Sequence, residues 1–233
     1  MTHPLVALAE PEDGFFVLRG LYTNSELDAM ADLVRALKSE APFAQPTMRD
    51  GTPLRVKVTS WGSKGWWADQ RGYRYIDAHP NTGKRWPDLP TELRMWAFRA
   101  FFAASMACKP WQPEAWGFRG AVSADYPDML DTCLVNLYDR GASLGWHVDE
   151  TERSLLPITT ISLGEPATFE IELSRGVVST TVYSGDAVIM AGASRRARHR
   201  VAGLVAADLF TKAHNPLRAG IRLSLTLRCT GLP

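Results

Sequence analysis

The strongest constraint on the fold of this chain is a series of short, strand-length segments that fills most of the sequence after Asp131. Helices of soluble domains are usually longer than these segments, and glycine or proline separates several of them. Six or more such strands in one run predict a sandwich of the jelly-roll type. The segments cover residues 132–138, 158–163, 167–173, 177–182, 186–190 and 221–228.

Two helices are expected ahead of these strands. Thr23 and Glu26 resemble a capping box, and apolar residues then recur at helical spacing, which predicts a helix over residues 25–38. A second helix is expected from Pro90 to about Ala107. With 233 residues, of which 45% are hydrophobic, the chain can bury one sizeable core, so a single domain is expected.

The last predicted strand, residues 221–228, alternates strictly between apolar and polar side chains. Its polar side chains share one face because successive residues of a strand point to opposite sides. They are Arg222, Ser224, Thr226 and Arg228. An exposed edge strand would show the same pattern. Asn136 and Tyr138, which share one face of an earlier strand, favour instead a polar cavity between strands. Residues 203–219 are expected to form a loop before the last strand.

An HxD pair, His147 and Asp149, lies between these two polar faces in the sequence. Side chains two apart on a strand point the same way, so one imidazole and one carboxylate can hold one cation. His199 could complete a triad of two imidazoles and a carboxylate, which is typical of non-heme Fe(II) oxygenases. On its own, His199 fits equally a solvated basic loop, because arginines surround it. The other histidines, His3, His79 and His214, have no partner pattern.

Arg222 and Arg228 suggest a cosubstrate for such a metal. A guanidinium is permanently charged and presents a planar fork that matches a carboxylate. A dicarboxylate such as 2-oxoglutarate needs one fork at its far end, hydroxyl or amide donors nearby, and a metal at its keto-acid end. The chain offers each of these parts.

Basic and aromatic residues are concentrated between Arg49 and Arg85, where eight Lys or Arg stand against three Asp or Glu. The net charge of the whole chain is only +1, so this asymmetry is local. Such a segment could meet a polyanion and stack on its bases, although Trp61 and Trp67 could equally be packing residues. The aromatic residues in or next to it are Trp61, Trp66, Trp67, Tyr73, Tyr75 and Trp86.

The cysteines and the N-terminus indicate a reducing compartment. Cys108, Cys133 and Cys229 are scattered and show no CxxC spacing, so neither a disulfide framework nor a thiolate metal site is expected. Residues 1–14 lack a basic stretch followed by an apolar run, and no segment approaches 18 consecutive apolar residues. We therefore expect a cytoplasmic protein without membrane association, acting as a monomer.

Several linked motifs, in one order and spacing, closely resemble the AlkB family of Fe(II)/2-oxoglutarate dioxygenases. The motifs are Leu134–Tyr138, Gly141, His147–Asp149, Ser162–Gly164, Ser194–His199 and Arg222–Arg228, preceded by Gly65–Trp66, Gln70–Tyr75 and Trp86–Pro87. The similarity covers nearly everything after about Pro42. It implies an α+β, mainly β fold with a double-stranded β-helix (jelly-roll) core, N-terminal supporting helices and a nucleotide-recognition lid.

The resemblance also implies domain limits and site residues. Residues 1–45 would form an extension with a supporting helix, residues 46–90 the lid, and residues 91–233 a second supporting helix and the core. The implied iron ligands are His147, Asp149 and His199. The implied 2-oxoglutarate contacts are Asn136, Tyr138, Arg222 at the distal carboxylate, Ser224 where the family has asparagine, and Arg228 near the metal-side carboxylate and Asp149. No further catalytic residue is implied, because the metal and cosubstrate carry the chemistry.

The substrate side of the resemblance rests on fewer residues. Trp66 resembles the residue that stacks on a flipped base, with Tyr73, Arg74 and Tyr75 near the base or its phosphates. Two further substrate contacts are implied at Thr151, where well-known bacterial members have aspartate, and at Arg175.

The implied activity is oxidative demethylation of N-alkyl lesions such as 1-methyladenine and 3-methylcytosine in single-stranded or flipped-out DNA or RNA. The enzyme would use Fe(II) as its metal, consume 2-oxoglutarate and O2, and release succinate, CO2 and formaldehyde. An RNA-directed enzyme, such as one acting on tRNA, and a hydroxylase of proteins or small molecules are the alternatives that this sequence leaves open.

Overall fold

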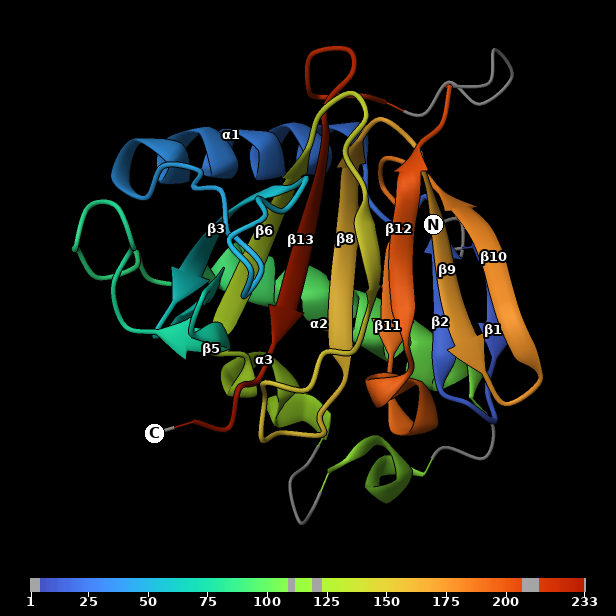
Figure 1. Cartoon of the computed structure of the whole chain (residues 1–233). Coiled ribbons are helices and arrows are strands. Elements are labelled where there is room, and N and C mark those ends of the chain that lie inside the picture. The colour runs from blue at the N-terminus through green and yellow to red at the C-terminus, as the bar shows by residue number, and fades with distance from the viewer. Residues whose placement is uncertain (1–4, 109–111, 119–122, 207–213, 233) are drawn as a thin grey trace.

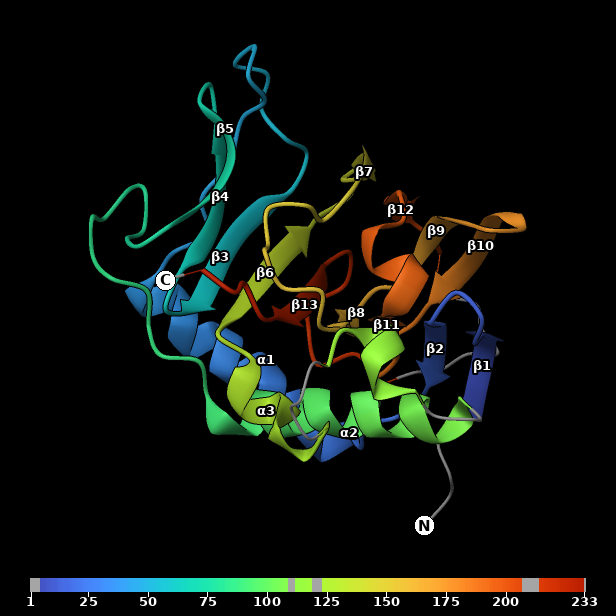
Figure 2. The same ribbon diagram turned by 90° about the horizontal axis from the view of Figure 1, so that it is seen from below.

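Two antiparallel sheets face each other, and two long helices cover the outer side of the larger one (Figures 1 and 2). The computed structural model describes residues 5–108, 112–118, 123–206 and 214–232. The larger sheet has the order β1 (Leu5–Glu10), β2 (Phe15–Arg19), β11 (Ala187–Met190), β8 (Ile158–Gly164), β13 (Arg222–Arg228), β6 (Thr132–Tyr138) and β3 (Lys57–Gly62). The smaller has the order β10 (Gly176–Val182), β9 (Ala167–Leu173), β12 (His199–Leu204) and β7 (Leu144–His147).

Side-chain alternation divides the apolar residues of the larger sheet into two layers. In β2, Phe16 and Leu18 pack with the helices, whereas Phe15 and Val17 pack toward the smaller sheet. Phe15 stacks there on Phe169 of β9, with ring centroids 6.1 Å apart. One core therefore lies between helices and sheet, and a second lies between the two sheets.

The helices are α1 (Asn24–Glu40), α2 (Thr91–Ala107) and the single turn α3 (Tyr126–Met129), and short 3-10 turns cover Pro113–Trp116, Ser123–Asp125 and Gly192–Arg196. The predicted capping box is confirmed: the hydroxyl of Thr23 accepts from the amide of Glu26, whose carboxylate accepts from the Thr23 amide. Within the described parts of the chain, no helix has both the length and the apolar character that a membrane span requires.

A separate hairpin, β4 (Gly65–Asp69) and β5 (Gly72–Ile76), stands beside β3 (Figure 2). Its first residue is glycine because the ring of Trp86 lies against it, and an added Cβ would be 2.2 Å from that ring. The expected lid segment, residues 46–90, thus contains both this hairpin and one strand of the larger sheet.

The predicted elements agree with the structure within about two residues at their ends. Both long helices are confirmed, and all six predicted strands are present. The strands β1 to β5, β7 and β12 were not predicted. The expected loop over residues 203–219 begins too early, because β12 continues to Leu204. Residues 207–213 lie outside the described chain.

Glu26 should stabilise the fold by joining the two long helices. It accepts hydrogen bonds from both terminal nitrogens of Arg99, at 2.8 and 3.0 Å. Partial burial opposes ionisation, but the bonds from Arg99 and Thr23 outweigh it and lower the pKa of Glu26 from 4.5 to about 2. We expect Glu26→Gln to reduce the free energy of unfolding at pH 7 by about 1 to 3 kcal/mol.

The pH dependence follows from the lowered pKa. The contribution of Glu26 is fully present above its unfolded pKa and disappears as pH falls through its folded value of about 2. Urea unfolding should therefore show a much smaller difference between wild type and variant at pH 2 than at pH 7. Glu40→Gln, at the exposed end of the same helix, is the control. A deficit as large at pH 2 as at pH 7 would contradict this account.

Candidate metal centre and cosubstrate pocket

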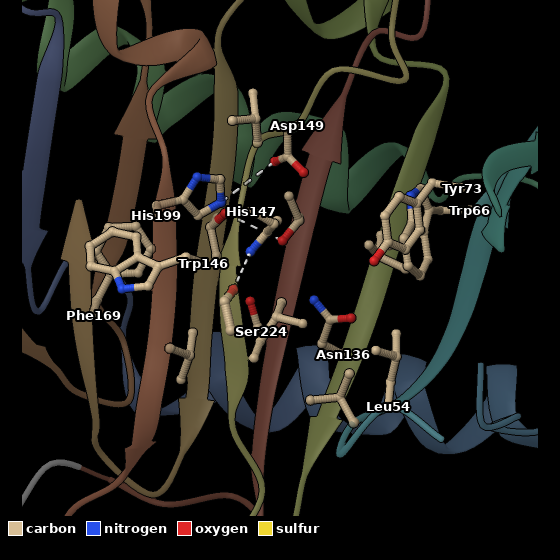
Figure 3. Close-up of a pocket in the computed structure, with 18 of the residues that line it drawn as sticks. Leu54, Trp66, Tyr73, Asn136, Trp146, His147, Asp149, Phe169, His199 and Ser224 are labelled. Atoms are coloured by element: carbon tan, nitrogen blue, oxygen red, sulfur yellow. Dashed lines mark hydrogen bonds and ion pairs between the residues drawn. The ribbon is translucent and has the colours of Figure 1, made fainter. Parts of the chain in front are cut away.

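His147, Asp149 and His199 come together at the pairing of β7 with β12 (Figure 3). His147 is the last residue of β7, His199 the first residue of β12, and the two are register partners. Directly opposed residues of antiparallel strands project to the same side. The candidate ligand atoms of the three residues all lie within 4.8 Å of one another. His199 Nε2 is 3.8 Å from Asp149 Oδ2, and the imidazole centroids are 4.3 Å apart.

Backbone carbonyls fix the orientation of both imidazoles. His147 Nδ1 lies 2.8 Å from the carbonyl of Gly145, and His199 Nδ1 lies 3.0 Å from that of Ala197. A ring that donates through Nδ1 keeps the lone pair of Nε2 for a metal. Burial lowers the pKa of His199 to about 4, so this ring is neutral at physiological pH.

Asp149 is held as a carboxylate by the positive charges around it. Burial alone would raise its pKa, but the guanidinium of Arg228, helped by that of Arg195, outweighs burial and holds the pKa of Asp149 well below its usual range. Arg228 Nη2 lies 3.2 Å from Asp149 Oδ2. Two oriented imidazoles and one ionised carboxylate, with ligand atoms within 4.8 Å of one another, are a donor set that fits Fe(II).

A cavity of about 490 Å³ begins at this triad and extends between the sheets. The polar faces predicted for β13 and β6 line it. Arg222 is the register partner of Tyr138, and Ser224 is the partner of Asn136. Thr226 and Arg228 line the same cavity. The prediction that these two strands form one polar cavity, rather than an exposed edge, is therefore confirmed.

Arg222 has the character of an anion-binding residue. Only 2% of it is exposed, and its Nη2 donates to the Ser162 hydroxyl at 2.9 Å. Its Nε and Nη1 have no hydrogen-bond partner among the described residues. Buried, unmatched guanidinium N–H groups are costly, and a carboxylate satisfies two of them at once. The far carboxylate of 2-oxoglutarate fits this place. Burial also raises the pKa of the neighbouring Tyr138 to about 12, so its hydroxyl remains a donor.

The hairpin supplies the opposite wall of the cavity. Trp66 and Tyr73 are stacked, with ring centroids 5.6 Å apart and planes 20° from parallel. Figure 3 shows both rings across the cavity from the metal triad, and both line it. Thr151 also lines the cavity, as do Met48, Arg49 and Leu54, which precede β3 and were not predicted as site residues.

Three other predicted substrate contacts lie elsewhere among the described residues. Tyr75 donates its hydroxyl to Glu152 at 2.5 Å and does not line the cavity. Arg74 alternates with Tyr73 and Tyr75 and so points the other way, where it pairs with Asp69.

Arg175, in the two-residue turn between β9 and β10, is exposed and pairs with Glu12 at 3.1 Å. The structure brings neither Arg74 nor Arg175 into the cavity.

Residues that the sequence reading set aside have structural partners. His79 Nε2 contacts the carbonyl of Pro42 at 2.6 Å, and His214 pairs with Asp28 at 2.7 Å. His3 lies outside the described residues. Trp61 is buried in the core beneath the helices.

Sequence reasoning missed a buried ion cluster behind the triad. Glu152 and Arg195 are each 2% exposed, and Glu152 contacts both Arg195 and Arg228. Burial would raise the pKa of Glu152, but Arg228 and further hydrogen bonds lower it below its usual value. In the sequence, Glu152 could have been noticed because it is the third acidic residue in the short segment Asp149–Glu152, which begins at a predicted metal ligand. Arg195 belongs to a basic run that resembles a solvated loop.

Comparison with known proteins agrees with this geometry. A family model described as the 2OG-Fe(II) oxygenase superfamily matches residues 14–228, so the chain belongs to that superfamily. The Alpha-ketoglutarate-dependent dioxygenase AlkB homolog of Caulobacter vibrioides (strain NA1000 / CB15N) is 34% identical over 219 residues, which are 92% of this chain and 87% of the relative. AlkB of Escherichia coli (strain K12) is 30% identical over 223 residues, 94% and 91% of the two chains. The protein is thus a member of the AlkB family of Fe(II)/2-oxoglutarate dioxygenases.

A solved structure supports the same fold. The structure of OsALKBH1 superimposes with a TM-score of 0.73 and covers 96% of this chain and 99% of its own, at 24% sequence identity. The predicted family, fold class, enzyme class and cofactors, Fe(II) with 2-oxoglutarate and O2, are therefore confirmed.

Arg222 should determine cosubstrate affinity without affecting the metal. We expect Arg222→Ala to raise the KM for 2-oxoglutarate by about 10- to 100-fold, because a charge-assisted carboxylate contact is lost. The affinity for Co(II), an inert substitute for iron, should stay within about 2-fold of wild type, because Arg222 does not contact the triad. Steady-state succinate formation and Co(II) titration measure the two quantities. An equal loss in both would show that the residue supports the whole pocket.

Proposed function

We propose that the enzyme oxidatively demethylates N-alkylated bases, such as 1-methyladenine and 3-methylcytosine, in single-stranded or flipped-out DNA or RNA. One observation carries the proposal: the stacked pair Trp66 and Tyr73 faces the metal triad across the cavity. A base against such a ring gains roughly 1 to 3 kcal/mol from stacking. An enzyme for small metabolites has no need of this wall.

The charge around the hairpin supports a polyanionic substrate. Several exposed cations of this segment have no carboxylate partner among the described residues, and these are Arg49, Arg55, Lys57, Lys84 and Arg85. Unpaired surface cations attract nucleic-acid phosphates through release of counterions. Arg49 also lines the cavity, where an entering strand would pass it.

The residues of the chain divide the work of the reaction. When bound, iron with 2-oxoglutarate and O2 supplies the oxidising chemistry that hydroxylates an N-methyl group. The triad fixes the metal at one end, and Arg222 orients the cosubstrate between the sheets. Trp66 and Tyr73 hold the base, while apolar side chains such as Val188 and Met190 form the floor and limit water. Extrusion of a paired base costs a few kcal/mol, which favours single strands.

The activity can be tested with a panel of methylated oligonucleotides. Protein, Fe(II), ascorbate, 2-oxoglutarate and single-stranded DNA with one 1-methyladenine should release formaldehyde and restore adenine. Matched RNA and tRNA carrying the same lesion decide the RNA-directed alternative, for which the neutral Thr151 leaves room. Succinate formation without turnover of any methylated DNA or RNA would instead indicate a protein or small-molecule hydroxylase.

Trp66 should be required for oligonucleotide turnover but not for cosubstrate use. We expect Trp66→Ala to lower kcat/KM for the methylated oligonucleotide by about 5- to 100-fold, the equivalent of the lost stacking energy. Uncoupled 2-oxoglutarate decay should change much less.

Trp67→Ala is the matched control, because Trp67 neighbours Trp66 on β4 but does not line the cavity. Equal losses in the two variants would mean that hairpin folding, rather than stacking, determines turnover.

A further inference from the structure

A continuous chain of polar contacts joins the hairpin to the metal ligand Asp149. We propose that Glu152 is a positioning residue of the metal centre, and that Tyr75, Glu152 and Arg228 form a relay through which hairpin occupancy and metal binding influence each other. The hairpin half of the proposal rests on the proposed function, since it takes a nucleotide as the occupant. The metal half does not.

Glu152 is the centre of the relay. Its side chain is fully buried. Oε1 accepts from Tyr75 and from Arg228 Nη1, each at 2.5 Å, and Oε2 lies 3.4 Å from Arg195 Nη2. Arg228 then contacts Asp149 through its other terminal nitrogen, at 3.2 Å. Glu152 therefore holds Arg228 in the orientation in which that arginine meets the metal ligand.

The buried charges balance only if Glu152 is ionised. Asp149 and Glu152 carry two negative charges, and Arg195 and Arg228 carry two positive charges. Arg195 also donates to the backbone carbonyl of Asp149 at 3.1 Å. Without the carboxylate of Glu152, the guanidinium groups of Arg195 and Arg228 would have only the carboxylate of Asp149 to balance them, next to the site of a divalent metal ion. Glu152 thus keeps the charge of Asp149 available to the metal.

The hairpin end of the relay is set by strand register. Tyr75 of β5 is the direct partner of Trp66 of β4, and Tyr73 lies two residues earlier on the same face. The face that presents Trp66 and Tyr73 to the cavity therefore also sends the Tyr75 hydroxyl to Glu152. A base stacked on Trp66 and Tyr73 holds this face in place, and the same hydrogen bond transmits that restraint to Arg228 and Asp149.

Coupling between two sites is reciprocal for binding affinities. The relay therefore predicts that a stacked nucleotide tightens metal binding and that the metal tightens nucleotide binding. Tyr75→Phe is the sharpest test, because it keeps the ring and removes only the hydroxyl that reaches Glu152. Tyr22→Phe is the control, since it removes a buried hydroxyl bonded to the Trp96 carbonyl at 3.0 Å, in the core beneath the helices.

The experiment measures the Kd of Co(II) in the presence of 2-oxoglutarate, with and without single-stranded DNA that carries one 1-methyladenine. The ratio of the two Kd values should be about 5-fold or more in wild type and Tyr22→Phe, within the range usual for coupled sites. It should fall toward 1 in Tyr75→Phe. A ratio near 1 in wild type, or an unchanged ratio in Tyr75→Phe, would overturn the relay.

The metal half is tested without any oligonucleotide. Glu152→Gln should weaken Co(II) binding by about 10- to 50-fold, because one positive charge near the divalent ion is then left uncompensated. The double variant Glu152→Gln with Arg195→Gln restores neutrality and should recover most of the affinity. A merely structural role of Glu152 predicts further loss in the double variant, and that result would overturn the proposal.

The two arms separate failure of the relay from failure of the proposed function. If methylated DNA does not bind at all, both the proposed function and the hairpin half of the relay are wrong, while the Glu152 arm still decides the metal half. If methylated DNA is demethylated normally but the Kd ratio survives in Tyr75→Phe, the function stands and the relay is wrong.

Discussion

The site depends on antiparallel pairing that keeps side chains in strict alternation. β13 sends Leu223, Leu225 and Leu227 into the core beneath the helices and its four polar residues into the cavity. On the other sheet, the pairing of β7 with β12 sets His199 opposite His147. A one-residue slip in either pairing would turn these side chains to the wrong face, so register alone determines whether a site exists.

Sequence reasoning was most successful where a strand has one polar and one apolar face. The alternation of residues 221–228 correctly predicted the polar face that lines the cavity. His147 and Asp149 come together as predicted, but not on one strand, because β7 ends at His147 and Asp149 follows it. β2 was missed because both of its faces are covered, so Phe15–Leu18 show no alternation. The Glu152–Arg195 pair was missed because its partners are 43 residues apart and each looks like a surface charge when taken alone.

The two arginines of β13 have opposite roles although they share one face. Both terminal nitrogens of Arg228 pair with carboxylates, those of Asp149 and Glu152, which also hold its pKa far above the usual value despite burial. Arg222 is buried without a carboxylate partner, and burial lowers its pKa. A guanidinium matched within the protein orients a ligand, whereas an unmatched one binds an anion from outside.

The two halves of the cavity belong to different sheets. All three metal ligands lie on or next to strands of the smaller sheet, and the cosubstrate contacts lie on β6 and β13 of the larger one. A molecule that touches both the metal and Arg222 therefore spans the sandwich and acts as a cross-brace between its layers. Because such a molecule binds only when the two sheets are packed together, its binding also stabilises their packing.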